Sequence, residues 1–249
     1  MRLALFLPCL TDSFYPRSAV AATKILQHLG HEVVFPQAQT CCGQPHYNAG
    51  FHDEARAVAK RMVEVFEPFE TVITTSGSCC SMVHEHFGPL LADDGAWAPR
   101  AKALDAKLHE FTRFLLSTLR IDLRALSARW EGRVTIHYSC HLRGLGITNE
   151  TERLLSQIDG LEIVPLKRQE QCCGFGGAFA SKYPTISGTM VADKVSCIAE
   201  TAVDTVVSSE AGCTMNIEGF ARRNGTAVRF ASAAEIIAES LGLLERPTR

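Results

Sequence analysis

The stretch Cys172-Cys173-Gly174-Phe175-Gly176-Gly177 decides our interpretation of this sequence. Its first three residues repeat an earlier motif, Cys41-Cys42-Gly43. Each vicinal cysteine pair is preceded by a lone cysteine at a separation of 31 intervening residues, and each is followed by a further cysteine. The later set repeats the earlier one at an offset of 131 residues, which becomes 134 at the last member. We interpret the two sets as metal or cluster sites built by one repeated unit: Cys9, Cys41, Cys42 and Cys79, then Cys140, Cys172, Cys173 and Cys213.

Composition limits the class of protein. The charged residues sum to 25 − 27 = −2, so nothing in the net charge suggests binding to nucleic acid or to an acidic membrane surface. The chain has 249 residues, enough to bury a core without disulfide staples, so its ten cysteines indicate metal or redox chemistry in a reducing compartment. We expect a cytoplasmic protein without a secretory signal, because MRLALFLPCL has one basic residue and no small-residue cleavage site. No apolar run is long enough to predict a membrane span.

Short apolar runs alternate with helical patterns in both halves of the chain. The expected strands are 2–7, 31–35 and 71–75, then 133–138, 161–165, 204–208 and 227–230. The expected helices are 16–29, 53–67, 99–119, 149–159, 184–200 and 232–241. This alternation predicts an α/β fold with two similar three-layer units of flavodoxin-like character and mainly parallel sheets, related by internal duplication and a pseudo-two-fold axis.

The predicted domains follow from the duplication. We expect a first cysteine-rich domain at 1–119, a linker at 120–132 and a second cysteine-rich domain at 133–249. Each predicted ligand cysteine lies just beyond an expected strand. Because parallel sheets place their binding sites outside the carboxyl ends of their strands, wide sequence spacings should become short distances there.

Thiolates are soft ligands that favour zinc, copper(I) or iron-sulfur clusters. Four cysteines per unit suit either a tetrahedral zinc ion or a [4Fe-4S] cluster. Neither set of four cysteines, which we call a frame, contains the paired C-x2-C knuckles of structural zinc sites. Two adjacent thiolates suit neighbouring iron atoms of a cluster better than a single ion. The residues therefore favour an iron-sulfur cluster, although zinc remains an alternative for one of the two sites. Glycines after each pair are expected to bring backbone amides near the sulfurs: Gly43, Gly174, Gly176 and Gly177.

The motifs also resemble a known family. SGSCCSMVHEHF at 76–87, SCHLRGLGI at 139–147 and CCGFGGAFA at 172–180 are similar to the lactate-utilisation protein A family. That family shares its cysteine-rich CCG domain with the cysteine-rich component of heterodisulfide reductase and with the iron-sulfur component of glycolate oxidase. The resemblance covers nearly the whole chain.

The resemblance implies an iron-sulfur electron-transfer component of a cytosolic system that oxidises L-lactate to pyruvate. It implies one or two [4Fe-4S] clusters on the eight cysteines of the two frames, and partners that include a ferredoxin-type iron-sulfur subunit and a third component. Since lactate oxidation removes two electrons, a flavin or another acceptor is expected on a different protein. The chain would then be a subunit of an oxidoreductase complex and not a complete enzyme.

One departure from the related proteins bears on chemistry. The heterodisulfide reductase pattern ends each repeat with C-x-x-C, whereas Met82 and Asn216 stand at the fifth cysteine position here. Five-thiolate sites therefore do not carry over. A heterodisulfide or thiol-disulfide reductase subunit, and a zinc-stabilised binding or scaffold protein, are the alternative functions.

Several other polar residues are expected to be structural. Cys80 and Cys197 fall outside the duplicated frame and are interpreted as buried core residues. Arg143 has two equally supported interpretations: it offsets the negative charge of a thiolate-rich cluster, or it is a solvated surface residue. The glycine-rich GFGG lacks the Lys and Ser/Thr of a P-loop, so cluster shielding is preferred to phosphate binding. The histidines near the cysteines are interpreted as structural or surface residues: His46, His84, His86, His137 and His141.

Overall fold

The computed structural model describes residues 1–247, and its strands form two sheets with the same topology. The first sheet has the order β2-β1-β3-β4, built from β1 (Arg2–Phe6), β2 (Glu32–Val34), β3 (Val72–Thr74) and β4 (Leu108–Glu110). The second has the order β6-β5-β7-β8, built from β5 (Arg129–Ile136), β6 (Asp159–Ile163), β7 (Thr205–Val207) and β8 (Arg229–Ala231). All six strand pairings are parallel, which confirms the predicted two-unit α/β fold.

Helices connect the strands within each unit. The first unit contains α1 (Cys9–Phe14), α2 (Pro16–His28), α3 (Gln44–Ala49), α4 (His52–Phe66), α5 (Gly77–Ser81), the π-helix η1 (Met82–Phe87), α6 (Gly88–Leu90), α7 (Ala98–Lys107), α8 (Phe111–Arg113) and the π-helix η2 (Phe114–Thr118). The second contains α9 (Cys140–Gly144), α10 (Glu150–Leu155), α11 (Ala178–Lys182), α12 (Pro184–Thr201), α13 (Ala211–Arg223) and α14 (Ala233–Ser240). No helix of residues 1–247 is long and apolar enough to span a membrane.

The single long helix predicted at 99–119 is wrong. Helix α7 ends at Lys107, and the chain then forms β4, which pairs with β3 through Val72–Leu108 and Thr74–Glu110. The apolar residues of the predicted helix are divided among four elements, α7, β4, α8 and η2, although Leu104, Leu108 and Phe111 are all buried. Pairing of Leu108–Glu110 with a buried neighbouring strand satisfies their backbone groups and overrides the local helical pattern.

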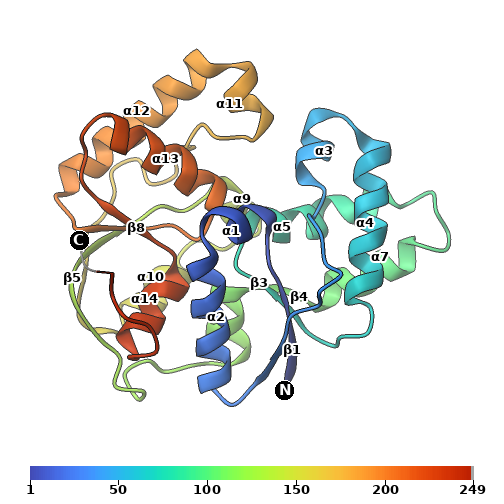
Figure 1. The fold of residues 1–249 in the computed structure, drawn as a ribbon, viewed down its shortest axis with the longest axis horizontal. Coiled ribbons are helices and arrows are strands. Elements are labelled where there is room, and N and C mark those ends of the chain that lie inside the picture. The colour runs from blue at the N-terminus through green and yellow to red at the C-terminus, as the bar shows by residue number, and fades with distance from the viewer. Residues whose placement is uncertain (248–249) are drawn as a thin grey trace.

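The two units pack against each other through equivalent elements. Helix α2 of the first unit lies beside α14 of the second in the middle of the molecule, and α8 contacts α10 in the corresponding way (Figure 1). Helix α5 contacts α9, and α1 contacts α13. Since α5 corresponds to α13 and α1 to α9, the partners are exchanged as a pseudo-two-fold relation requires.

A hydrophobic core crosses the boundary between the units. One cluster of buried side chains includes Ile25 and Leu26 from α2 together with Val134 from β5 and Ile237 from α14. Two smaller clusters lie within the individual units, around α4 and around α12. The cysteine loops of both units consequently lie near the boundary between the units, where α1, α5 and α9 converge (Figure 1).

Candidate metal centres

Each cysteine of the duplicated frame lies beyond the carboxyl end of a strand. Cys9 begins α1 directly after β1, and Cys140 begins α9 after β5. Cys79 and Cys213 lie near the start of α5 and α13, which follow β3 and β7. The vicinal pairs occupy the loops that follow β2 and β6.

The fold brings the sulfurs of each frame together. In the first unit, Cys9 Sγ lies 3.7 Å from Cys41 Sγ, and Cys42 Sγ lies 3.3 Å from Cys79 Sγ. In the second unit, Cys173 Sγ lies 3.0 Å from Cys213 Sγ, and Cys140 and Cys172 line the same cavity as this pair. Residues up to 40 positions apart in sequence are therefore neighbours at the sheet edge. The two sites have the same depth order, with Cys9 and Cys140 exposed, Cys41 and Cys172 half-buried, and the other four buried.

Thiol hydrogen bonds make one cysteine in each site the most acidic. Hydrogen bonds from Cys42 and Cys9 hold the pKa of Cys41 far below its ordinary value. In the second site, hydrogen bonds from Cys140 and Cys173 do the same for the pKa of Cys172. Donation of these bonds raises the pKa of the donating thiols, and burial adds to the effect. Metals bind thiolates, so the lowered pKa values favour Cys41 and Cys172 as ligands.

Two of the four glycines place a backbone amide near a sulfur. The amide of Gly43 donates a hydrogen bond to Cys41 Sγ at 3.4 Å, and the amide of Gly174 does so to Cys172 Sγ at 3.4 Å. Both glycines have positive φ, +85° and +80°. A Cβ at Gly174 would also lie 2.9 Å from the carbonyl oxygen of Ser187, so the turn has no room for a side chain.

The remaining glycines of the second loop shape its surroundings. Gly176 and Gly177 both have positive φ and lead into α11, without an amide-to-sulfur hydrogen bond in the described residues. Phe175, between the glycines, covers α13 closely, because a Cβ at Gly212 would lie 2.7 Å from its ring. The loop is therefore held against the helix that carries Cys213.

The second site opens into a cavity between the units. This cavity has a volume of about 140 Å³ and is bounded by Cys140, Cys172 and Cys173 on one side and by Gln44 and Ser78 of the first unit on the other. Gln44 Nε2 donates to the carbonyl oxygen of Ser78 and lies 3.2 Å from His141 Nε2. Gln44 therefore links the residue before Cys79 in the first unit to the residue after Cys140 in the second.

The other cysteines and histidines discussed from the sequence lie in different surroundings. Cys80 and Cys197 are buried, as expected, and His84 pairs with Asp105. His86 stacks on the ring of Tyr47 at 4.4 Å. The side chains expected at the fifth cysteine positions also have structural contacts: Met82 is fully buried, and Asn216 Nδ2 donates to the carbonyl oxygen of Cys173 at 2.8 Å.

His137 does not fit the structural interpretation that its sequence position suggested. It directly follows β5, is 3% exposed, and has no hydrogen-bond partner at either ring nitrogen among the described residues. Burial, with a contribution from Lys194, lowers its pKa to about 3, which keeps the imidazole neutral. A ring nitrogen of His137 and the sulfurs of Cys173 and Cys213 all lie within 4.8 Å of one another. Nothing in the motif spacing distinguishes this histidine from the others.

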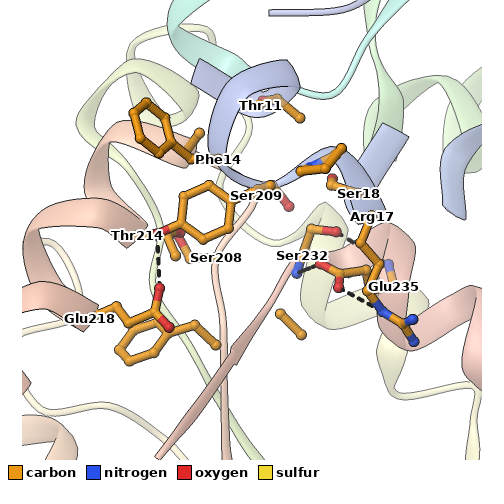
Figure 2. Close-up of a pocket in the computed structure, with 15 residues that line it drawn as sticks. Thr11, Phe14, Arg17, Ser18, Ser208, Ser209, Thr214, Glu218, Ser232 and Glu235 are labelled. Atoms are coloured by element: carbon orange, nitrogen blue, oxygen red, sulfur yellow. Dashed lines mark hydrogen bonds and ion pairs between the residues drawn. The ribbon is translucent and has the colours of Figure 1, made fainter. Parts of the chain in front are cut away.

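A second cavity lies away from the cysteines. It has a volume of about 220 Å³ and separates α1 and α2 from the ends of β7 and β8. Tyr15 Oη donates a hydrogen bond to Glu218 at 2.8 Å. Arg17 is paired with Glu235 at a distance of 3.2 Å, and Figure 2 shows these two side chains together. Its principal charged groups already have partners, so the cysteine sites are the stronger candidates for chemistry.

Comparison with known proteins supports the duplicated frame. The sequence model of the cysteine-rich CCG domain matches residues 3–84 and 134–218. Lactate utilization protein A of Macrococcus caseolyticus (strain JCSC5402) is 43% identical over 95% of this chain and 96% of its own length. The protein of that name from Geobacillus sp. (strain WCH70) is 41% identical over 95% of this chain and 99% of its own.

Among solved structures, a hypothetical protein from Helicobacter pylori superposes with a TM-score of 0.70 at 9% sequence identity. The match covers 97% of this chain and 49% of that one, so the chain spans about half the length of the solved protein. At this identity the likeness concerns the fold alone.

Proposed function

Because the chain belongs to the lactate utilization protein A family of cysteine-rich CCG-domain proteins, we propose that it is an iron-sulfur electron-transfer component of a system that oxidises L-lactate to pyruvate. The observation that carries the proposal is the convergence of four cysteines at the same edge of each sheet. Its partners would be other lactate-utilisation proteins, including a ferredoxin-type iron-sulfur subunit and a third component.

The donor set fits iron-sulfur chemistry. Cysteine thiolates hold such clusters, and amide hydrogen bonds to their sulfurs tune the reduction potential. Both are found here, as four thiols per site and the amides of Gly43 and Gly174 directed at Cys41 and Cys172. A [4Fe-4S] cluster would supply a one-electron redox centre to each site that binds it.

The chain's own residues would control access and charge. In each site the exposed cysteine, Cys9 or Cys140, faces solvent while the buried cysteines exclude water from the opposite side. Oxidation of lactate to pyruvate releases two electrons and two protons. An acceptor on a partner protein would take these first, and this chain would pass electrons on singly through its exposed side.

One observation favours zinc as a second candidate, in a zinc-stabilised binding or scaffold protein. The Sγ–Sγ separations of 3.0 to 3.7 Å are close to the edge of a single tetrahedral site, roughly 3.8 Å for Zn–S bonds of about 2.3 Å. A heterodisulfide reductase component is less well supported, since Asn216 is hydrogen-bonded to backbone where a fifth thiolate would be needed.

Anaerobic reconstitution with iron and sulfide separates these functions. The expected product contains between one and two [4Fe-4S] clusters per chain, with visible absorption that bleaches on reduction by dithionite. C42S and C173S should each lose the absorption of one site, since each removes a buried thiol from its frame. C197S is the matched control, because Cys197 is equally buried but lies outside both frames.

The opposite result is equally specific. The electron-transfer proposal would be wrong if the protein retained one or two zinc ions per chain and formed less than one cluster. That result would support a zinc-stabilised binding or scaffold protein. Absorption that survives in both C42S and C173S would show that these thiols are not ligands.

A further inference from the structure

The second site contains a buried imidazole that the duplicated cysteine pattern does not include. The backbone amide of His137 donates to the carbonyl oxygen of Val207 at 2.9 Å, which fixes its position between β5 and β7. From there its ring reaches Cys173 and Cys213, with all three ligand atoms within 4.8 Å of one another. The ring therefore lies beside the two buried cysteines of the second site.

An unpaired imidazole is costly in this position. Both ring nitrogens of His137 lack a partner among residues 1–247, and the side chain is almost fully buried. A buried polar group without a hydrogen bond costs roughly 1 to 3 kcal/mol. A metal centre between the thiols would supply the missing partner, because neutral imidazole nitrogen joins thiolate sulfur in metal sites.

The first site shows that the fold itself does not need a histidine there. At the frame offset of 131, His137 corresponds to Phe6, which is fully buried and packs edge-on against Phe66 at 5.5 Å. A hydrocarbon ring therefore fills the equivalent space behind Cys42 and Cys79. The imidazole is a chemical difference between two otherwise matched sites.

We propose that a ring nitrogen of His137 is a further ligand of the metal centre held by Cys140, Cys172, Cys173 and Cys213. The inference rests on the proposed function, and it makes the second centre a mixed nitrogen and sulfur site while the first remains all-thiolate. A neutral nitrogen donor adds no negative charge, unlike a thiolate, and the identity of the ligands is one of the factors that set the potential of an iron-sulfur centre. The two centres would therefore differ in midpoint potential.

Pulsed EPR on the reconstituted, dithionite-reduced protein tests the ligand directly. Protein labelled with ¹⁵N only in histidine should show one strong hyperfine coupling, of the size that a directly bound nitrogen gives. H137F should abolish that coupling and shift the midpoint potential of the second centre, since it places a phenyl ring where the first unit has Phe6. H141Q is the control and should retain the coupling, although His141 Nδ1 lies 3.8 Å from Cys140 Sγ.

The outcomes distinguish the ligand role of His137 from the proposed electron-transfer function. Iron-loaded wild-type protein with only weak, through-space ¹⁵N coupling would overturn the ligand role while leaving the relay intact, and this measurement does not depend on how H137F folds. A coupling that disappears in H141Q instead would overturn it as well. Failure to bind iron and sulfide at all would overturn both proposals together.

Discussion

At the scale of single residues, the first cysteine of each vicinal pair is the most acidic thiol of its site, because neighbouring thiols lower its pKa. Cys41 and Cys172 each accept a hydrogen bond from the amide of the glycine two positions later, and Cys41 accepts another from Cys9 Sγ. The amide can reach back to the sulfur because that glycine adopts a left-handed backbone conformation. The glycine of each CCG motif thus places an amide donor at the sulfur of the first cysteine.

This geometry predicts a specific sensitivity at Gly174. G174A should lower the free energy of unfolding by about 2 kcal/mol or more, because it combines left-handed strain with a Cβ placed 2.9 Å from Ser187 O. It should also reduce the metal content of the second site. Urea denaturation and metal analysis check both effects. G225A is the matched control, since Gly225 has φ of +72° and nothing within 4 Å of the added Cβ, so it should keep its metal.

At the scale of elements, the two helices that carry Cys79 and Cys213 are tied together. Ser76 caps α5, and Glu210 stands at the corresponding position before α13. The Glu210 carboxylate accepts hydrogen bonds from Ser76 Oγ at 3.0 Å, Ser78 N at 2.8 Å and Ser78 Oγ at 2.7 Å. A residue of the second unit therefore holds the start of the first unit's cysteine helix.

Removal of this carboxylate should loosen the first site. E210A is expected to destabilise the protein by about 3 kcal/mol, since it leaves buried donors unpaired, and to weaken metal binding at Cys79. A double-mutant cycle with S78A should give a coupling free energy of about 1 to 3 kcal/mol. E218A, which breaks the bond to Tyr15 farther from the cysteines, is the control and should retain full metal content. Equal metal loss in both variants would count against a local effect.

At the scale of the whole molecule, the units are joined by a buried ion-pair network at one end of the shared core. Glu239 on α14 is bonded to Arg17 of the first unit, to Arg229, and to Trp130 Nε1. Its side chain is 1% exposed. Burial alone would raise the pKa of Glu239, but hydrogen bonds from Arg229 and Arg17 outweigh it and hold the pKa below the ordinary value of 4.5.

The sign of this pKa shift predicts a pH dependence. Because the folded pKa is depressed, the stabilisation from Glu239 is fully present above pH 4.5 and is lost as pH falls through the folded pKa. E239Q should therefore cost about 3 kcal/mol at pH 7, where it strands two guanidinium groups, and progressively less in acid. Denaturant unfolding of E239Q and of the unmodified protein, at pH 7 and at a pH below 4.5, measures how this loss of stability changes with pH. E32Q, in the exposed pair with Arg2, should change stability by less than about 1 kcal/mol at either pH.

Much of the fold was predictable because its signals are local and repeated. Apolar runs placed seven of the strands, and Pro16, Gly30 and Pro184 marked helix boundaries close to where they lie. The strand β4 was missed, since Leu108–Glu110 is too short to interrupt an apolar periodicity of helical type. Its pairing with β3 forms only when the whole sheet is assembled.

From the sequence alone we could predict the duplication, the parallel α/β units and the set of cysteines that converge. These follow from spacing and from the rule that strand ends share one edge of a parallel sheet. The positions of His137 beside Cys173 and Cys213, and of Glu210 between the two cysteine helices, emerged from the folded chain. Both depend on contacts between segments distant in the chain, for which a single sequence carries no local pattern.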